Sequence, residues 1–402
     1  MLQSIELFAG GGGMALGLHA AGFEHSQLVE WDPRACDTLR LNGATSVPHT
    51  GQLPWSAERV LEGDVRHYAA ALGASAEAVD LVAGGPPCQP FSLGGVHAGH
   101  SDARNMFPAA LDVVRAVQPK FVIFENVPGL LRPTFSPYFD YVEDQLMAAS
   151  IAPRAKETWQ DHRRRILRGA NASELRYRVR RQIILAADLG IPQMRRRVFM
   201  IGVRDDVNAE WLNLAADHSA DALLFAKYVS GSYWQEHADE AEVKKLLKRG
   251  LPTPPARLIP RVARLQAGEP PAEKRWRTVR DMLREPEQLV TPVDGQQRGP
   301  WPNHVGVSGA RSYAGHSGSD IDLPAKTIKA GVHGVCGGEA MIRFRDDSLR
   351  YMTTREAARI QGFPDWYEFT GARSHAMRHI GNAVSVKVAQ AVGERLRQLT
   401  GL

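Results

Sequence analysis

Several features are scarce in this sequence of 402 residues, and each scarcity excludes a class of protein. The chain has only 3 cysteines, Cys36, Cys88 and Cys336, too far apart for a disulfide framework or for the paired spacing of a zinc site. No run of about 18 apolar residues occurs, and the first residues lead into an apolar strand without a basic region. We therefore expect no metal, no membrane span and no secretion, and reduced thiols in a cytoplasmic protein.

Positive charge is concentrated in one part of the chain. The net charge is +5, yet residues 154–181 hold ten basic and three acidic residues, so the remainder is slightly acidic. A charge run is often a solvated face, but this concentration favours a nucleic-acid partner. With 44% hydrophobic residues, the chain is long enough for a sizeable core and for two domains.

The stretch Leu81 to Ser92 holds the first candidate for chemistry. Residues 79–83 predict a short buried strand, and two glycines and two prolines end it abruptly before Cys88. In open α/β sheets, ligands bind at the carboxyl ends of the strands. A lone cysteine is usually an inert core residue, but prolines on both sides indicate a rigid turn and favour a nucleophile.

The amino-terminal region predicts a cofactor site of the Rossmann type. Residues 5–9 predict a strand, residues 10–13 are all glycine, and residues 14–18 begin a helix, so backbone N–H groups are accessible to a polar ligand. After a second strand, Glu30 can bind ribose hydroxyls and Trp31 can stack on adenine. Asp64 can accept a hydrogen bond from an exocyclic amine. The pattern fits a nicotinamide enzyme, an S-adenosylmethionine enzyme or a plain glycine turn.

Two further strands bring charged groups to the same predicted edge. Residues 108–117 predict a helix, and the strand at 121–124 leads to Glu125, which is either a surface acid or, beside a thiol, a proton donor to a ring nitrogen. Before them, the glycine-rich loop 94–100 is typical of a loop that closes over substrate. Strand alternation after residue 192 places Gln193, Arg195 and Arg197 on one side, where arginines suit phosphate or carbonyl groups.

The ordered motifs resemble those of DNA cytosine-5 methyltransferases over about the first 200 and last 55 residues. They are Phe8-Ala9-Gly10-x-Gly12-Gly13, Glu30-Trp31, Gly63-Asp64-Val65, Gly85-Pro86-Pro87-Cys88-Gln89-Pro90-Phe91-Ser92, Glu125-Asn126-Val127, Gln193-x-Arg195-x-Arg197, residues 350–365 and Gly381-Asn382-Ala383-Val384. The resemblance implies a Rossmann-like α/β sheet with a smaller, loop-rich target-recognition domain. Residues 1–205 with 374–402 would form the catalytic domain, and residues 206–373 the recognition domain.

The same resemblance implies a role for each matching residue. Cys88 would attack carbon 6 of cytosine, Glu125 would engage N3 and the amino group, Arg197 would hold the carbonyl, and Arg195 would contact phosphate or the loop. S-adenosylmethionine would be surrounded by Phe8, Gly10, Gly12, Glu30, Trp31, Asp64, Val65, Pro86, Met106, Asn382 and Ala383. Nucleic acid would be contacted by Gln89, Ser92, Gly94, Gly95, Arg104 and Gln193. The target base must leave the duplex for this chemistry.

Alternatives remain within and outside this family. A transfer RNA cytosine methyltransferase would keep Cys88 and Glu125, although the insertion of roughly 140 residues favours DNA. A catalytically silent DNA-binding relative is the second alternative. We expect a monomer that acts on double-stranded DNA near the nucleoid, with a restriction endonuclease as a separate partner.

Overall fold

The computed structural model describes residues 2–45, 53–72, 79–87, 105–312, 317–330 and 340–401. Contacts within the chain define two compact units. Unit 1 comprises residues 1–184, 196–214 and 363–402, and unit 2 comprises residues 185–195 and 215–362. These bounds differ from the predicted domains in two ways. Residues 185–195, expected in the catalytic domain, fall in unit 2, and residues 206–214 and 363–373, expected in the recognition domain, fall in unit 1.

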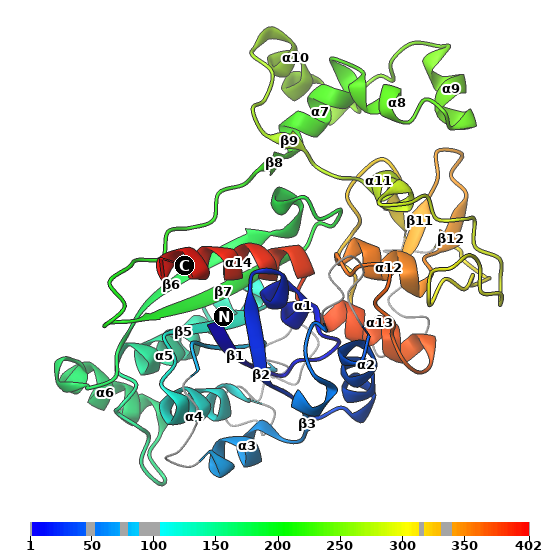
Figure 1. The fold of residues 1–402 in the computed structure, drawn as a ribbon. Coiled ribbons are helices and arrows are strands. Elements are labelled where there is room, and N and C mark those ends of the chain that lie inside the picture. The colour runs from blue at the N-terminus through cyan, green and yellow to red at the C-terminus, as the bar shows by residue number, and fades with distance from the viewer. Residues whose placement is uncertain are drawn as a thin grey trace. The chain divides into compact units, whose positions relative to one another are not determined.

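Unit 1 is built on a seven-stranded sheet with the order β3-β2-β1-β4-β5-β7-β6 (Figure 1). Strands β1 to β5 run parallel, and β7 is antiparallel to β5. The strands are β1 Leu2–Leu7, β2 Phe23–Glu30, β3 Val60–Glu62, β4 Leu81–Gly84, β5 Phe121–Asn126, β6 Tyr177–Leu185 and β7 Arg196–Arg204. The strands predicted at 5–9, 27–29, 79–83 and 121–124 are therefore present with shifted ends.

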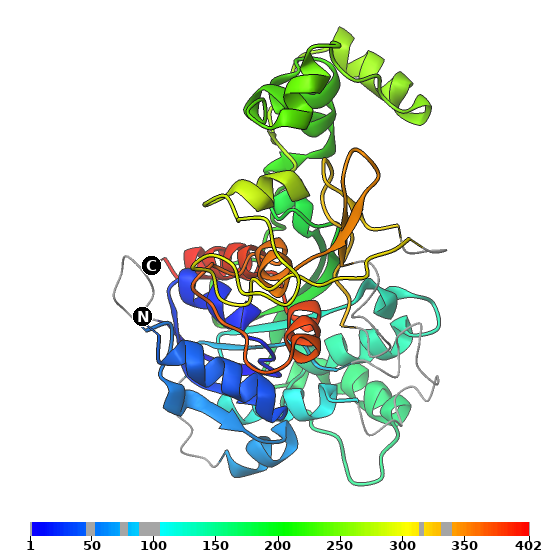
Figure 2. The same cartoon turned by 90° about the vertical axis from the view of Figure 1, so that its right-hand side faces the viewer.

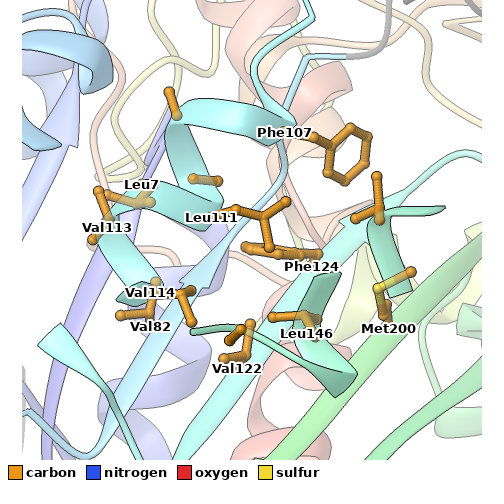
Figure 3. Packing of buried hydrophobic residues seen from close by; sticks show 14 of the residues in the cluster. Leu7, Val82, Phe107, Leu111, Val113, Val114, Val122, Phe124, Leu146 and Met200 are labelled. Atoms are coloured by element: carbon orange, nitrogen blue, oxygen red, sulfur yellow. The ribbon is translucent and has the colours of Figure 1, made fainter. Parts of the chain in front are cut away.

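The core of unit 1 forms where aliphatic strands meet α4. Every residue of β5 is buried, as a central strand covered on both faces requires. Leu111, Val114 and Phe107 of α4 pack on Val82 and Phe124 (Figure 3). The helices of unit 1 are α1 Gly13–Ala20, α2 Pro33–Gly43, α3 Val65–Ala71, α4 Phe107–Val117, α5 Ser136–Met147, α6 Trp159–Gly169, α13 Arg373–Asn382 and α14 Val386–Leu399.

The two ends of unit 1 in the sequence are adjacent in space. Helix α14, red in Figures 1 and 2, lies against the dark-blue α1. Val388, Val392 and Leu396 of α14 are buried, whereas Ala391 is partly exposed.

Unit 2 has short strands and many connecting loops, in agreement with the loop-rich domain that the resemblance implied. It contains a three-stranded sheet β10-β11-β12 and a two-stranded sheet β8-β9. Its elements are β8 His218–Ser219, α7 Ala220–Tyr228, α8 Ser232–Glu236, α9 Ala241–Leu247, α10 Ile259–Ala267, β9 Lys274–Arg275, α11 Val279–Arg284, β10 Ser319–Asp320, β11 Met341–Arg343, β12 Leu349–Tyr351 and α12 Thr354–Ile360. Thr353 and Glu356 form a capping box that begins α12.

Helix length and polarity bear on the membrane question. Within the ranges that the structure describes, no helix is both long and apolar enough to cross a bilayer.

Candidate active site at the carboxyl edge of the sheet

The topology of unit 1 gathers the ends of six strands at one edge. Because β1, β2, β3, β4 and β5 are parallel, the residues that follow them lie at their common carboxyl edge. Strand β7 runs the other way and pairs Val198 with Asn126, so its first residues are at the same edge. Glu125 and Arg197, 72 positions apart in the printed sequence, are therefore neighbours.

Glu125 and Arg197 form an ion pair. The Arg197 Nε atom lies 3.0 Å from Glu125 Oε1, and the exposed fractions of the two side chains are 17% and 8%. Such a pair is only weakly screened by water and fixes the orientation of the carboxylate. A Cβ atom at Gly85 would lie 3.3 Å from Glu125 Oε2, so the turn after β4 approaches the carboxylate closely.

Asn126 ties the end of β5 to the turn that leads toward Cys88. Its Nδ2 donates to the Pro86 carbonyl oxygen at 2.9 Å, and its Oδ1 accepts from the Val127 N–H. Both Asn126 and Pro86 are buried. The motif Glu-Asn-Val was expected to supply the glutamate alone, so this positioning role of the asparagine is an addition from the structure.

The ends of β1 and β2 are joined through Glu30. Its Oε2 accepts from the Gly10 N–H at 2.8 Å, and its Oε1 accepts from the N–H groups of Trp31 and Asp32. Burial raises the pKa of Glu30, and the three backbone donors oppose that rise. The neighbouring indole of Trp31 is 76% exposed.

Phe8 has an unusual backbone conformation between β1 and the glycine turn. Its φ is 58°, which costs a residue with a Cβ on the order of 1 kcal/mol or more. Such strain is typical of binding sites. The sequence motif identified Phe8 as a candidate only by its residue type, because backbone strain leaves no signal in the sequence.

Asp64 and Val65 begin α3. Asp64 is the N-cap, accepting from the Arg66 N–H, and its carboxylate also pairs with the Arg66 guanidinium. The hydrogen bond from Arg66 lowers the pKa of Asp64. Val65 is buried in the core. Asp64 remains partly exposed and ionised, as an acceptor for an amine requires.

The other expected cofactor residues of unit 1 come from distant parts of the chain. Ala383 is buried against the glycine turn, because a Cβ at Gly13 would lie 3.0 Å from its own Cβ. Asn382 is the last residue of α13 and is exposed. Met106 is the N-cap of α4 and packs partly buried on the core.

Gln193 and Arg195 belong to unit 2 and are buried there. The Gln193 amide donates to Gln361 Oε1 at 2.7 Å and accepts from the Ile328 N–H, while Arg195 donates to the Ile328 carbonyl oxygen. With Gln193 at 0% exposure, these bonds give it a structural role that its motif did not predict. Contacts of either residue with nucleic acid stay a prediction.

Six expected site residues lie outside the described residues: Cys88, Gln89, Ser92, Gly94, Gly95 and Arg104. Pro86 and Pro87, which precede the cysteine, are described, and they place the start of this segment at the carboxyl end of β4.

The basic segment 154–181 is rich in salt bridges. Most of its arginines pair with carboxylates, several of which come from outside the segment. The pairs are Arg163–Asp144, Arg164–Asp161, Arg165–Glu157, Arg176–Asp205, Arg180–Glu210 and Arg181–Asp140. These pairs offset part of the positive charge of the segment, and its contact with nucleic acid stays a prediction.

One cluster in the described part of the chain has the composition of a metal site. Potential ligand atoms of Glu236, His237 and Asp281 lie within 4.8 Å of one another. The Arg275 guanidinium bonds to Asp281 at 2.7 Å and also to Glu236. Since an arginine already supplies the cation, we interpret this cluster as an ion-paired network in unit 2.

The fold and the site together define the class of protein. A mostly parallel α/β sheet, with a glycine turn after its first strand and charged groups converging at its carboxyl edge, is the arrangement of a doubly wound enzyme with its site at that edge. The model of the C-5 cytosine-specific DNA methylases matches residues 2–149 and 169–398. The chain belongs to this family and is a DNA cytosine-5 methyltransferase.

Individual relatives agree with this assignment. The Type II methyltransferase M.NgoMIV of Neisseria gonorrhoeae is 28% identical over 98% of this chain and 96% of its own length. M.AquIA of Picosynechococcus is 37% identical over 50% of this chain and 71% of its own length. Among solved structures, the S. pombe Dnmt2 methyltransferase has a TM-score of 0.55 at 19% identity, covering 99% of both chains. A candidate DNA modification methyltransferase from an E. coli prophage has a TM-score of 0.56 at 21% identity, covering 100% of both. These two structural matches show the fold.

Proposed function

We propose that this enzyme methylates carbon 5 of cytosine within one short sequence of double-stranded DNA, using S-adenosylmethionine, base flipping and a covalent adduct of Cys88. The observation that carries the proposal is the Glu125–Arg197 pair at the end of β5, beside the turn toward Cys88. A cytosine needs a nucleophile at carbon 6, an acid at N3 and a donor at its carbonyl oxygen. Glu125 and Arg197 supply the acid and the donor from neighbouring strand ends, and Cys88 would supply the nucleophile.

The residues at the ends of β1 and β2 fit the nucleoside part of S-adenosylmethionine. The exposed Trp31 indole offers a stacking face for adenine, and Glu30 keeps acceptor capacity beside the bonds it receives from the backbone. When bound, S-adenosylmethionine supplies an electrophilic methyl group on a sulfonium. Phe8, Gly10, Gly12, Asp64, Val65, Pro86, Met106, Asn382 and Ala383 would complete its surroundings.

The residues of the chain make carbon 5 nucleophilic. The Cys88 thiolate forms a bond to carbon 6, and the electron pair of the 5,6 double bond moves to the 4,5 bond. The pair of the double bond between carbon 4 and N3 moves onto N3, which takes a proton from Glu125. Arg197 hydrogen-bonds the carbonyl oxygen and keeps Glu125 oriented. Carbon 5 then takes the methyl group with the electron pair of the 4,5 bond, and N3 returns its proton to Glu125 as the carbon 4–N3 double bond re-forms. Loss of the carbon 5 proton to water restores the 5,6 double bond and breaks the carbon–sulfur bond, which releases the thiolate. The base must be outside the stack, at a cost of about a few kcal/mol.

Unit 2 would select the DNA sequence. Its short strands and long loops are suited to base contacts, because loops on a rigid scaffold carry recognition. The relatives named above are Type II methyltransferases, which supports a role in restriction and modification with a separate endonuclease as partner. Gln89, Ser92, Gly94, Gly95, Arg104 and Gln193 are the proposed further contacts to DNA, and Arg195 would assist the catalytic loop.

The proposal can be tested by bisulfite sequencing of plasmid and host DNA from cells that lack their own cytosine methylation. Expression of the natural chain should protect cytosines in one short sequence. Cys88→Ser should abolish protection, and Glu125→Gln should slow methylation by about 100-fold or more while the protein still binds S-adenosylmethionine. Full methylation by Cys88→Ser would refute the covalent mechanism. Protection of RNA alone would refute the DNA substrate.

A further inference from the structure

We propose that Tyr367 is a positioning residue for the cofactor-binding glycine turn, which it holds in its binding conformation from the far end of the chain. The inference rests on the proposed use of S-adenosylmethionine. It assigns to Tyr367 a role that the motifs of the sequence do not include. Its basis is the contact between the glycine turn and the segment that precedes α13.

Tyr367 is completely buried and reaches the turn through its hydroxyl group. The Oη atom donates to the Gly11 carbonyl oxygen at 2.9 Å, and the side chain is 0% exposed. Burial raises the pKa of Tyr367, which keeps the hydroxyl protonated and able to donate. Phe363 and Phe369 pack against its ring with centroid distances of 5.0 and 5.3 Å. The aromatic ring is therefore fixed in place.

The segment that carries Tyr367 is itself anchored to α2. The Glu368 N–H donates to Asn42 Oδ1 at 2.9 Å, and Asn42 Nδ2 donates back to the Glu368 carbonyl oxygen at 2.8 Å. Thr370 and Thr38 share a hydroxyl hydrogen bond of 2.8 Å. Tyr367 is thus held on a rigid support within unit 1.

The glycine turn is shaped to receive this tyrosine. Gly12 has a φ of 80°, and a Cβ atom there would lie 2.5 Å from the Tyr367 Oη atom. Any other residue would both strain the backbone and collide with the hydroxyl. The absence of a side chain at Gly12 therefore serves the approach of Tyr367, in addition to any approach of a cofactor.

Two side chains hold the turn, one on each side of the Gly10–Gly11 peptide group. Glu30 accepts from the Gly10 N–H, and Tyr367 donates to the Gly11 carbonyl oxygen. Together they fix the orientation of the peptides around Gly11. If the hydroxyl is lost, the peptides of the turn sample other orientations. Cofactor binding must then include the free-energy cost of restoring the binding conformation, which weakens the affinity.

The test compares two tyrosines that make the same kind of bond. Tyr177 is also buried in unit 1, and its Oη atom donates to the Pro119 carbonyl oxygen at 2.8 Å, away from the glycine turn. Titration calorimetry of S-adenosylmethionine should show Kd about fivefold to tenfold higher for Tyr367→Phe and unchanged for Tyr177→Phe. In steady-state assays, KM for the cofactor should rise for Tyr367→Phe while kcat and KM for DNA stay the same. Similar thermal stability of the two variants would separate positioning from a loss of folding.

A double-mutant cycle gives a second readout. Gly12→Ala should weaken cofactor binding strongly in the natural chain and less in a Tyr367→Phe background, because the collision with the hydroxyl is gone. Equal cofactor affinity for Tyr367→Phe and the natural chain would overturn the inference. Failure of the natural chain itself to bind S-adenosylmethionine would instead overturn the proposed function.

Discussion

The two compact units are stabilised by different interactions. In unit 1, the centre is an apolar cluster of strand and helix residues, and the charged residues that matter for chemistry lie at the sheet edge. In unit 2, charged side chains are themselves in the interior. Arg280 is 1% exposed, with its Nε atom 2.7 Å from Asp322 Oδ1 and further pairs to Glu240 and Glu242.

The interior charges of unit 2 form a connected network. Asp281 accepts from Arg275, and it also hydrogen-bonds to His237 at 3.1 Å. Burial alone would raise the pKa of Asp322, but hydrogen bonds and charge from Arg280 hold it below its usual value. A buried pair of this kind adds little net stability when complete, yet its disruption leaves an uncompensated charge. Unit 2 should therefore be sensitive to changes of charge, and unit 1 to changes of volume.

The largest effect on stability is expected from Arg280→Met. The change removes the buried cation shared by Asp322 and Glu240 and leaves them only the more exposed Arg345 and Arg284, at a cost of up to about 3 to 5 kcal/mol. Hydrogen exchange measured by mass spectrometry should show faster exchange in peptides of residues 215–362. Arg261→Met is the matched control, since its pair with Asp221 is 40% and 42% exposed and is worth about 1 kcal/mol at most. Equal effects of the two variants would contradict the contrast between the units.

A somewhat smaller loss is expected when the apolar core of unit 1 loses volume. Leu146 on α5 is 0% exposed, so Leu146→Ala should lower the free energy of unfolding by about 2 to 5 kcal/mol. Its neighbour Met147 is 47% exposed, and Met147→Ala should change the free energy of unfolding little. Denaturant titration with hydrogen exchange would assign the loss to unit 1. Faster hydrogen exchange in peptides of unit 2 instead of unit 1 would contradict the expectation that unit 1 is the unit sensitive to changes of volume.

The smallest effect concerns Glu6, a buried acid within the apolar unit. Burial and the nearby Glu30 raise the pKa of Glu6 well above its usual value. The folded state therefore favours the protonated acid, and stability falls as pH rises from about 4.5 through the folded-state pKa. Glu6→Gln should remove this fall and add on the order of 1 kcal/mol or more at pH 8.

Unfolding curves at pH 4 and pH 8 would measure this effect. The exposed Glu24 of the adjacent strand offers the control Glu24→Gln, for which we expect little change. A Glu6→Gln variant that is less stable at pH 8 would show that the carboxylate is charged and paired in the folded protein.

Local patterns in the sequence predict much of unit 1. Strands β4 and β5 follow from short apolar runs bounded by glycine and proline. In unit 2, the capping box of Thr353 follows from its spacing to Glu356. The arrangement of parallel strands then implies that Glu125 lies at the edge to which the Cys88 segment leads. These predictions succeed because each depends on residues close in sequence or on a known rule of topology.

Pairs between distant residues could not be predicted in this way. Arg280 and Asp322 are 42 positions apart, and Tyr367 and Gly11 are 356 apart. No local period encodes which arginine meets which carboxylate. The same limitation explains the basic segment, whose charges are offset by Asp144 and Asp205 from neighbouring elements.

The bond from Tyr367 to Gly11 also has a consequence for the order of events during synthesis. The glycine turn leaves the ribosome early, whereas its tyrosine follows 356 residues later. At about 5 to 20 residues per second, a nascent chain spends tens of seconds with an unsupported turn. Under the proposed role of Tyr367, a chain that has not yet reached this residue should bind S-adenosylmethionine more weakly than the finished chain.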